Sequence, residues 1–114
     1  MEKICIVYVT AKNKEEAFAI GEKLVFMRLA ACANVIDGVT SVYRWEGKIE
    51  ESDEAVLIVK TREKLLCEIK LAVRKLHSYS CPCIEAIPII DADKEYAEWV
   101  IAETSSKARI QKKR

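Results

Sequence analysis

The stretch that decides the fold is residues 28–48, RLAACANVIDGVTSVYRWEGK. Its part from 33 to 45 is too rich in Val, Thr, Tyr and Trp to be helical, so it predicts strand. Gly38, which follows an aspartate, predicts a bend or bulge between two collinear strand pieces. Gly47 completes a two-residue Glu-Gly turn of the kind that needs a positive φ. We therefore expect a long strand that returns through a tight β-hairpin.

The residues before this stretch predict a strand and then a helix. Residues 3–11 contain the β-branched run ICIVYVT, which is continuous enough for a strand buried on both faces. Asn13 can cap the following helix, and Glu15 and Glu16 lie in its first turn, where the helix dipole favours acids. Apolar residues at three- and four-residue steps mark one buried helix face: Ala17, Ile20, Leu24, Met27 and Ala31.

The residues after the hairpin turn predict its return strand and a second helix. The strand passes through the acidic residues 50–54 and enters the apolar run 55–59. Thr61 is a weak cap for the next helix, because a lysine stands three residues later, where a capping box has Glu or Gln. The helix itself is clear from apolar residues at helical intervals: Leu65, Leu66, Ile69, Ala72, Val73 and Leu76. It reaches His77.

The last part of the domain predicts an edge strand and a short helix. Residues 84–90 form the strand, and Pro88 demands an edge or a bulge because proline cannot donate to a ladder. Asp93 caps the final helix. The order βαββαβ plus a helix predicts an α+β fold, a ferredoxin-like sandwich with an antiparallel sheet, over residues 1–104.

Both long helices of such a sandwich cover one face of the sheet. The other face keeps apolar residues that a domain of this size cannot bury: Val42, Ile49, Val56 and Ile58. The sequence therefore predicts self-association. Residues 105–114 carry five basic residues and no acid, which predicts a flexible, solubilising tail; without an aromatic platform it does not indicate nucleic-acid binding.

The composition indicates one domain in a reducing compartment. The 114 residues contain no run of about 18 apolar residues, and charged Glu2 and Lys3 precede the first strand, so neither a membrane span nor a signal peptide is expected. The five cysteines are an odd number without a C-x-x-C pair, which argues against a secreted disulfide framework. A cytoplasmic protein is the expectation.

The grouping of soft metal ligands is His77, Cys81 and Cys83. Imidazole and thiolates suit copper(I) or zinc, and the fourth position is left to water, Glu85 or another subunit. The alternative is structural: the histidine complements the helix dipole, and the cysteines pack beside Pro82 as apolar filler.

Other candidates carry weaker signals. The acidic run Glu50, Glu51, Asp53 and Glu54 could hold a hard cation, but such a run is more often a solvated strand end. The residues 43–48 could form a ligand pocket with a neighbouring chain or simply a packed hairpin end. With one histidine and dispersed glycines, no enzyme is expected.

Residues 28–34 and 43–48, together with the segment from His77 to Pro82, resemble the CutA divalent-cation-tolerance family. The resemblance runs from about residue 4 to 104. It implies a homotrimer in which long hairpins extend into the neighbour's sheet, and a role in tolerance of metal ions. Nitrogen-regulatory PII proteins share the trimeric plan, so a regulatory module that binds an effector between subunits is the alternative.

The resemblance also bears on the ligands. His77 matches a histidine that is a proposed copper ligand in some members of the family. Ser78 stands where many relatives have proline, and Cys83 stands where many have an acid, which would shift the preference towards soft copper or zinc. Val9 replaces a cysteine that is a proposed copper ligand in one branch.

Overall fold

The computed structural model describes residues 2–105. Strands and helices follow one another in the order β1 (Ile4–Ala11), α1 (Lys14–Phe26), β2 (Cys32–Trp45), β3 (Lys48–Arg62), α2 (Leu66–Leu76), β4 (Ile84–Pro88) and α3 (Lys94–Glu103). A short 3-10 helix, η1 (Glu63–Leu65), leads from β3 into α2. The basic tail predicted for 105–114 lies outside the described residues, apart from Ser105.

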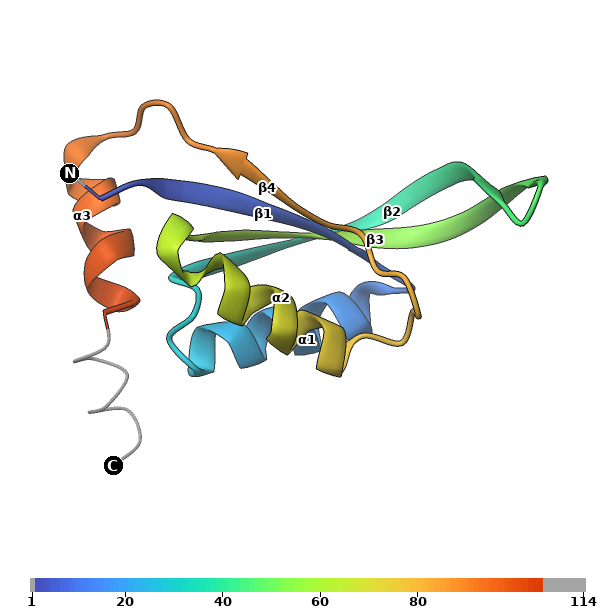
Figure 1. Cartoon of the computed structure of the whole chain (residues 1–114), viewed down its shortest axis with the longest axis horizontal. Helices are drawn as coiled ribbons and strands as arrows, with labels where there is room; N and C mark the ends of the chain where they lie inside the picture. Colours follow the sequence, from blue (N-terminus) through green and yellow to red (C-terminus); the bar gives the residue numbers. More distant parts are fainter. Residues whose placement is uncertain (1, 106–114) are drawn as a thin grey trace.

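The strands form one antiparallel sheet in the order β2-β3-β1-β4. Helices α1 and α2 lie side by side against one face, α3 lies at one end of the sheet, and the β2–β3 hairpin projects beyond the helices at the other end (Figure 1). The predicted ferredoxin-like α+β sandwich with an additional C-terminal helix is confirmed.

The hairpin has the predicted bulge and turn. The pairing of β2 with β3 shifts register between Ile36 and Val39, and Gly38 within this shift has a φ of +76°. The bulge bends β2 but does not divide it into two strands. At the tip, Glu46 and Gly47 have φ values of 51° and 81°, the positive values that tight hairpin turns need.

The core lies between the sheet and the two long helices. Alternate residues of the central strands β1 and β3 point towards α1 and α2, and their side chains are fully buried together with those of the helices: Val7, Val9, Leu57, Val59, Leu24 and Ile69. This packing fixes the position of α1 and α2 against the sheet, and thus the position of the loops at the helix ends.

The helix starts agree with the sequence at two of three positions. Asn13 Oδ1 accepts the N–H of Glu16 at 2.8 Å, and Asp93 Oδ2 accepts the N–H of Tyr96 at 3.3 Å, so both predicted caps are confirmed. The cap predicted at Thr61 is wrong. That residue lies within β3, and its buried hydroxyl donates to the carbonyl of Leu29 at 2.7 Å.

The first helix is shorter than the apolar spacing suggested. It ends at Phe26, because Arg28 takes a positive φ of 62° and turns the chain back towards the sheet. Met27 was expected on the buried face and is 40% exposed, so that expectation is wrong. Ala31 is buried after the turn, but it is not part of the helix.

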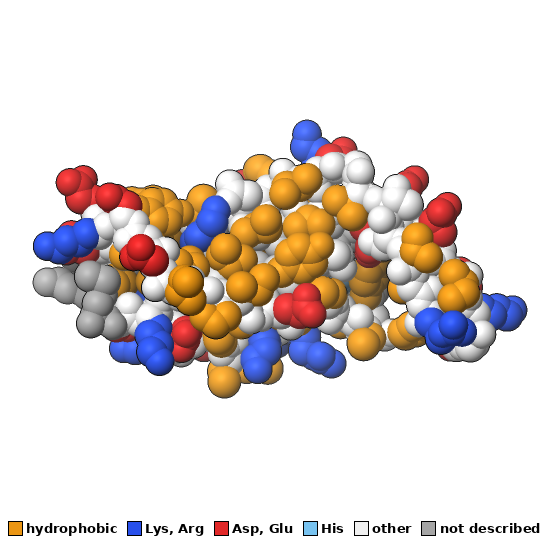
Figure 2. All heavy atoms as spheres, turned by 90° about the horizontal axis from the view of Figure 1, so that it is seen from above, with side chains coloured by type: hydrophobic (Ala, Val, Ile, Leu, Met, Phe, Trp, Pro, Cys, Tyr) orange, Lys and Arg blue, Asp and Glu red, His pale blue; other side chains and the backbone are white. Residues whose placement is uncertain are grey.

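The sheet face opposite α1 and α2 is largely open. Apolar side chains form a broad patch across the middle of the molecule seen from this side (Figure 2). Val42 and Ile49 are 66% and 64% exposed, but the prediction that they lie on this face is wrong. Val42 pairs with Glu51, and residues 49 and 51 of β3 alternate in step with the core residue Leu57, so both side chains belong to the helix side of the sheet. They are exposed because the hairpin projects beyond the helices (Figure 1).

Val56 was also predicted to lack cover, but it is buried, because its paired neighbours Thr10 and Ile36 flank it on both sides. The edge strand β4 ends at Pro88, two residues before the predicted end.

Candidate functional site

The loop between α2 and β4 carries the predicted ligands, and His77 attaches it to the sheet. The residue directly follows α2, and its side chain is fully buried. Its Nε2 lies 2.7 Å from the carbonyl oxygen of Thr10, and its Nδ1 accepts the backbone N–H of Tyr79 at 3.1 Å. The neutral tautomer with the proton on Nε2 satisfies both contacts. Both ring nitrogens are therefore engaged within the protein.

Glu16 holds the same loop to the start of α1. One carboxylate oxygen accepts the N–H of Ser78 at 2.9 Å, and the other accepts the N–H of Lys12 at 3.0 Å. Burial alone would raise the pKa of Glu16, but the hydrogen bonds from Lys12 and Ser78 outweigh it and lower the pKa below 4.5. The ionised carboxylate thus links two segments that are far apart in the sequence.

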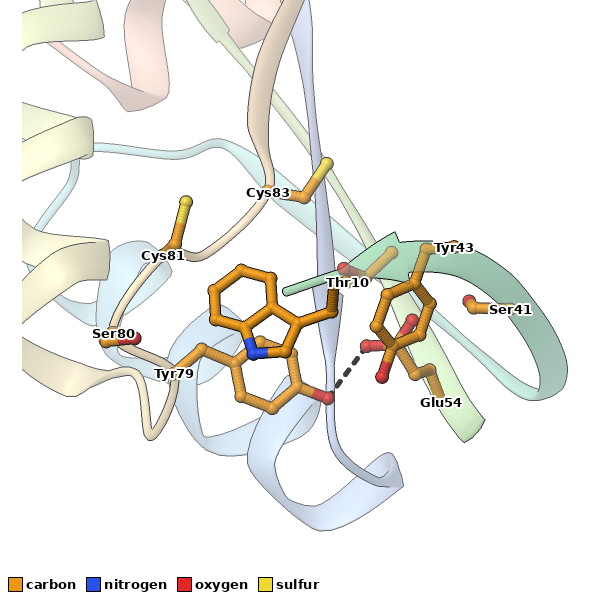
Figure 3. Close-up of a pocket in the computed structure, with 9 residues that line it drawn as sticks. Thr10, Ser41, Tyr43, Glu54, Tyr79, Ser80, Cys81 and Cys83 are labelled. Carbon is orange, nitrogen blue, oxygen red and sulfur yellow. Dashed lines mark hydrogen bonds between the residues drawn. The ribbon is translucent and has the colours of Figure 1, made fainter. Parts of the chain in front are cut away.

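A third link joins the loop to the base of the hairpin. The hydroxyl of Tyr79 donates to Glu54 Oε2 at 2.7 Å (Figure 3). The Glu54 residue is only 8% exposed. Burial, together with the hydrogen bond and the negative charge of Glu54, raises the pKa of Tyr79. The phenol therefore stays protonated and donates a hydrogen bond to the carboxylate.

These contacts leave a cavity of about 510 Å³ between the hairpin and the loop. Ser41, Tyr43 and Glu54 lie on the hairpin side (Figure 3). The loop contributes four residues on the other side: Tyr79, Ser80, Cys81 and Cys83. Trp45 also lines the cavity. A cavity of this size is in the range that holds small ligands.

The structure brings two of the three predicted metal ligands to this cavity. Cys81 is exposed, Cys83 is half-buried, and both line the cavity. His77 does not line it, since its ring is directed to Thr10 and Tyr79. Within residues 2–105, no three His, Cys, Asp or Glu side chains are grouped closely enough to hold one metal ion.

Cys83 has its own local partner. Its Sγ lies 3.6 Å from an oxygen of Glu85, the residue that the sequence suggested as a further ligand. Burial and the charge of Glu85 raise the pKa of the Cys83 thiol. A metal ion bound at Cys83 would therefore have to displace a proton.

Sequence reasoning missed the residues that hold the loop in place. Glu16 was noted only as a first-turn acid, and Glu54 only as part of an acidic run whose other three acids are exposed. A detectable signal existed for Glu54, because it directly precedes the apolar run 55–59. Nothing in the local sequence pairs it with Tyr79, which lies 25 residues later.

Comparisons with known proteins agree on one family. Residues 5–103 match the family model of the CutA1 divalent ion tolerance protein. The chain is 40% identical over 99 residues to the divalent-cation tolerance protein CutA of Thermus thermophilus, covering 87% of this chain and 96% of that protein. It also resembles the solved structure of the periplasmic divalent cation tolerance protein CutA from Archaeoglobus fulgidus. There the TM-score is 0.87 and the identity 40%, over 90% of this chain and 99% of that one.

These names correct the expected localisation. The Archaeoglobus fulgidus protein is described as periplasmic. A CutA protein of Arabidopsis thaliana, 40% identical over 95 residues that make up 83% of this chain and 52% of that protein, is described as chloroplastic. The cytoplasmic expectation is therefore not supported, because proteins similar to this chain are described in other compartments. None of the described helices is long and apolar enough to span a membrane.

The match extends over almost the whole of the described structure. It begins within β1 and ends at the last residue of α3, so it includes the hairpin, the loop and the cavity between them. The family is named for tolerance of divalent ions rather than for a reaction. On the family model, the sequence identity and the shared fold, this chain belongs to the CutA1 divalent ion tolerance family.

Proposed function

We propose that the protein is a homotrimer that binds a soft transition-metal ion, copper or zinc, and contributes in this way to divalent-cation tolerance. The observation that carries the proposal is the placement of Cys81 and Cys83 on the wall of one accessible cavity. Thiolates favour copper(I) and zinc over hard divalent ions. The names of the relatives support a relationship to divalent cations in general.

The ligands differ in how readily they can reach a metal ion. Cys81 and Cys83 are accessible and serve as the first two ligands, and Glu85 lies beside the second thiol. His77, the third predicted ligand, joins only if it gives up its hydrogen bonds to Thr10 and Tyr79. Water or another subunit supplies the remaining position. Protein thiols must lose protons to bind, so metal affinity falls as the pH is lowered.

The open face of the sheet supports self-association. The strand register places Ile36 of β2 and Ile87 of β4 on the same face as Ile58 of β3. The two edge-strand isoleucines are each 48% exposed. They contribute to an apolar surface of the kind that soluble proteins cover by association, and the exposed Val42 and Ile49 add apolar area on the other side of the projecting hairpin. The family resemblance favours three copies with the hairpin reaching a neighbour.

The proposal is of a binding protein and not of an enzyme, since the ring nitrogens of His77 are both committed to structural contacts. A second candidate function follows from the cavity: a PII-like regulatory module that binds a small effector beside the hairpin. Tyr43 and Trp45 line the cavity as that function requires.

Native mass spectrometry of the reduced protein, titrated anaerobically with zinc and then copper(I), tests the first proposal. We expect a trimer that takes up metal at low stoichiometric additions. The double variant Cys81→Ser/Cys83→Ser should lose this uptake, whereas Cys67→Ser, which removes another exposed thiol on α2, should retain it. Unchanged uptake by the double variant would refute the thiol site, and a monomer or dimer would refute the trimer.

A further inference from the structure

The cavity beside Glu54 has a charge pattern that metal binding by the thiols does not use. Among the described residues that line it, Glu54 is the one acid, and no Lys, Arg or His is present. Within residues 2–105, no cationic side chain lies within 4.0 Å of its carboxylate. The carboxylate accepts one hydrogen bond from Tyr79, which is a neutral donor. The cavity thus has a net negative charge that no neighbouring side chain balances.

The walls of the cavity are aromatic. Tyr43, Trp45 and Tyr79 line it, and the face of an aromatic ring attracts a cation through its quadrupole. The orientation of Tyr43 is supported by Ser52, whose hydroxyl donates a hydrogen bond to the tyrosine oxygen at 3.3 Å. The orientation of Tyr79 is supported by its hydrogen bond to Glu54. The rings and the carboxylate are therefore held as parts of one wall rather than as independent surface groups.

We propose that this cavity binds a small organic cation, a primary amine or a guanidinium on an apolar body, with Glu54 as its counter-charge and the three aromatic side chains as its walls. The proposal names the ligand class for the second candidate function above and does not depend on metal binding. The volume of about 510 Å³ suits a small molecule.

The same chemistry disfavours the other ligand classes. A hard metal ion needs six or more oxygen ligands, while the cavity offers a single carboxylate and aromatic walls. An anion would face Glu54 without a cationic partner. A neutral apolar molecule would leave the carboxylate desolvated without a counter-charge, which costs free energy. An organic cation meets both the charge and the apolar walls.

Three probes with one carbon skeleton test the charge preference: phenethylammonium, 2-phenylethanol and phenylacetate. Isothermal titration calorimetry on the full chain in its native assembly should give the tightest binding for phenethylammonium. We expect it to bind about tenfold more tightly than the alcohol, because a hydrogen bond to a charged group is stronger than one between neutral groups. Phenylacetate should bind most weakly. Equal affinities, or no binding of phenethylammonium, would overturn the proposal.

The variant Glu54→Gln assigns the preference to this side chain, since glutamine keeps an acceptor for Tyr79 and removes the charge. It should lose most of the tenfold preference for phenethylammonium over 2-phenylethanol, because only the attraction of the aromatic faces remains. Glu51→Gln, the same change at an exposed position of β3, should leave the tenfold difference intact. A tenfold preference that survives undiminished in Glu54→Gln would place the cation elsewhere.

Two further variants complete the test. Trp45→Leu, at a half-exposed wall position, should weaken phenethylammonium binding several-fold, and it replaces Glu54→Gln as the decisive variant if that protein does not fold. Cys81→Ser/Cys83→Ser should keep the charge preference while it loses metal. Loss of the charge preference together with metal uptake in the cysteine variant would overturn Glu54 as the counter-charge, whereas loss of metal uptake alone would leave it standing.

Discussion

The two halves of β3 share one neighbouring strand, β2, and differ in what else surrounds them. Residues 48–54 and 55–60 both pair with β2 in one antiparallel ladder. The second half also pairs with β1 and is covered by the helices, and Ala55, Leu57 and Val59 in it are fully buried. In the first half, residues other than Ser52 and Glu54 are exposed.

The difference shows that burial is set by what lies beside and beneath a strand rather than by the strand itself. An apolar residue such as Ile49 is exposed in the projecting half because neither β1 nor a helix reaches it. Glu54 lies at the junction of the two halves, where β1 begins to pair. There a charged residue is buried and the cavity opens, so the junction combines packing with polar chemistry.

The largest effect is expected from truncating one apolar side chain in each half of β3, which tests whether the two halves differ in their contribution to stability. Leu57→Ala should lower the free energy of unfolding by about 3 kcal/mol, because it leaves a cavity in the core. Ile49→Ala should change the stability of a subunit by less than about 0.5 kcal/mol and should instead weaken association. Urea unfolding at two protein concentrations separates the effects, since the deficit of the Leu57 variant relative to wild type should be the same at both, whereas the deficit of the Ile49 variant should change with dilution. Equal, concentration-independent losses would contradict the comparison.

The next largest effect is expected at Glu16, where hydrogen bonds rather than apolar packing hold the loop between α2 and β4. Glu16→Gln should cost about 1–2 kcal/mol at neutral pH, because the ionised carboxylate accepts N–H groups of Lys12 and Ser78. The folded pKa of Glu16 is lowered from 4.5, so its contribution is complete above pH 4.5 and is lost as the pH falls through the folded pKa.

Thermal unfolding of wild type and Glu16→Gln across this acid range measures the difference. The gap between them should close below pH 4.5, where the wild-type carboxyl gains its proton. Glu15→Gln, at an exposed neighbouring position, is the matched control and should show no such gap. A gap that persists unchanged at low pH would mean that shape rather than charge holds the loop.

The smallest effects are expected at the tip of the projecting half. Gly47→Ala should destabilise the hairpin by about 1 kcal/mol, because its φ of 81° is unfavourable for a residue with a Cβ. Glu46→Asn should stabilise it by a few tenths of a kcal/mol, roughly the preference of asparagine for such turns. Amide hydrogen exchange at residues 42–51 reports both changes. If Gly47→Ala stabilised the hairpin and Glu46→Asn destabilised it, the tip would be held by a partner subunit and not by its own turn.

Much of the architecture could be predicted because its signals are local. The bulge at Gly38, the turn at Gly47 and the caps at Asn13 and Asp93 depend on residues within a few positions of one another. The first helix was predicted too long, because the apolar spacing continues past the point where Arg28 reverses the chain. Periodicity records which face of a segment is apolar and does not record where the segment turns.

The candidate site was predicted only in part. The thiols of Cys81 and Cys83 do lie at one cavity, since two positions on one short loop cannot separate far. Their grouping with His77 stays a proposal, because the structure gives both ring nitrogens partners from β1 and from the loop. Neither partner is a side chain, so no residue type in the sequence could have indicated them.

What the sequence by itself determined is the order of the strands and helices, the hairpin and the family, since these depend on local patterns and on the residues between 28 and 48. Only the tertiary structure decided that Glu54 is buried, that Tyr79 donates to it, and that Glu16 holds the loop. The physical reason is distance along the chain. These contacts join residues 25 and 62 positions apart, and their energies exist only after the sheet and helices have packed.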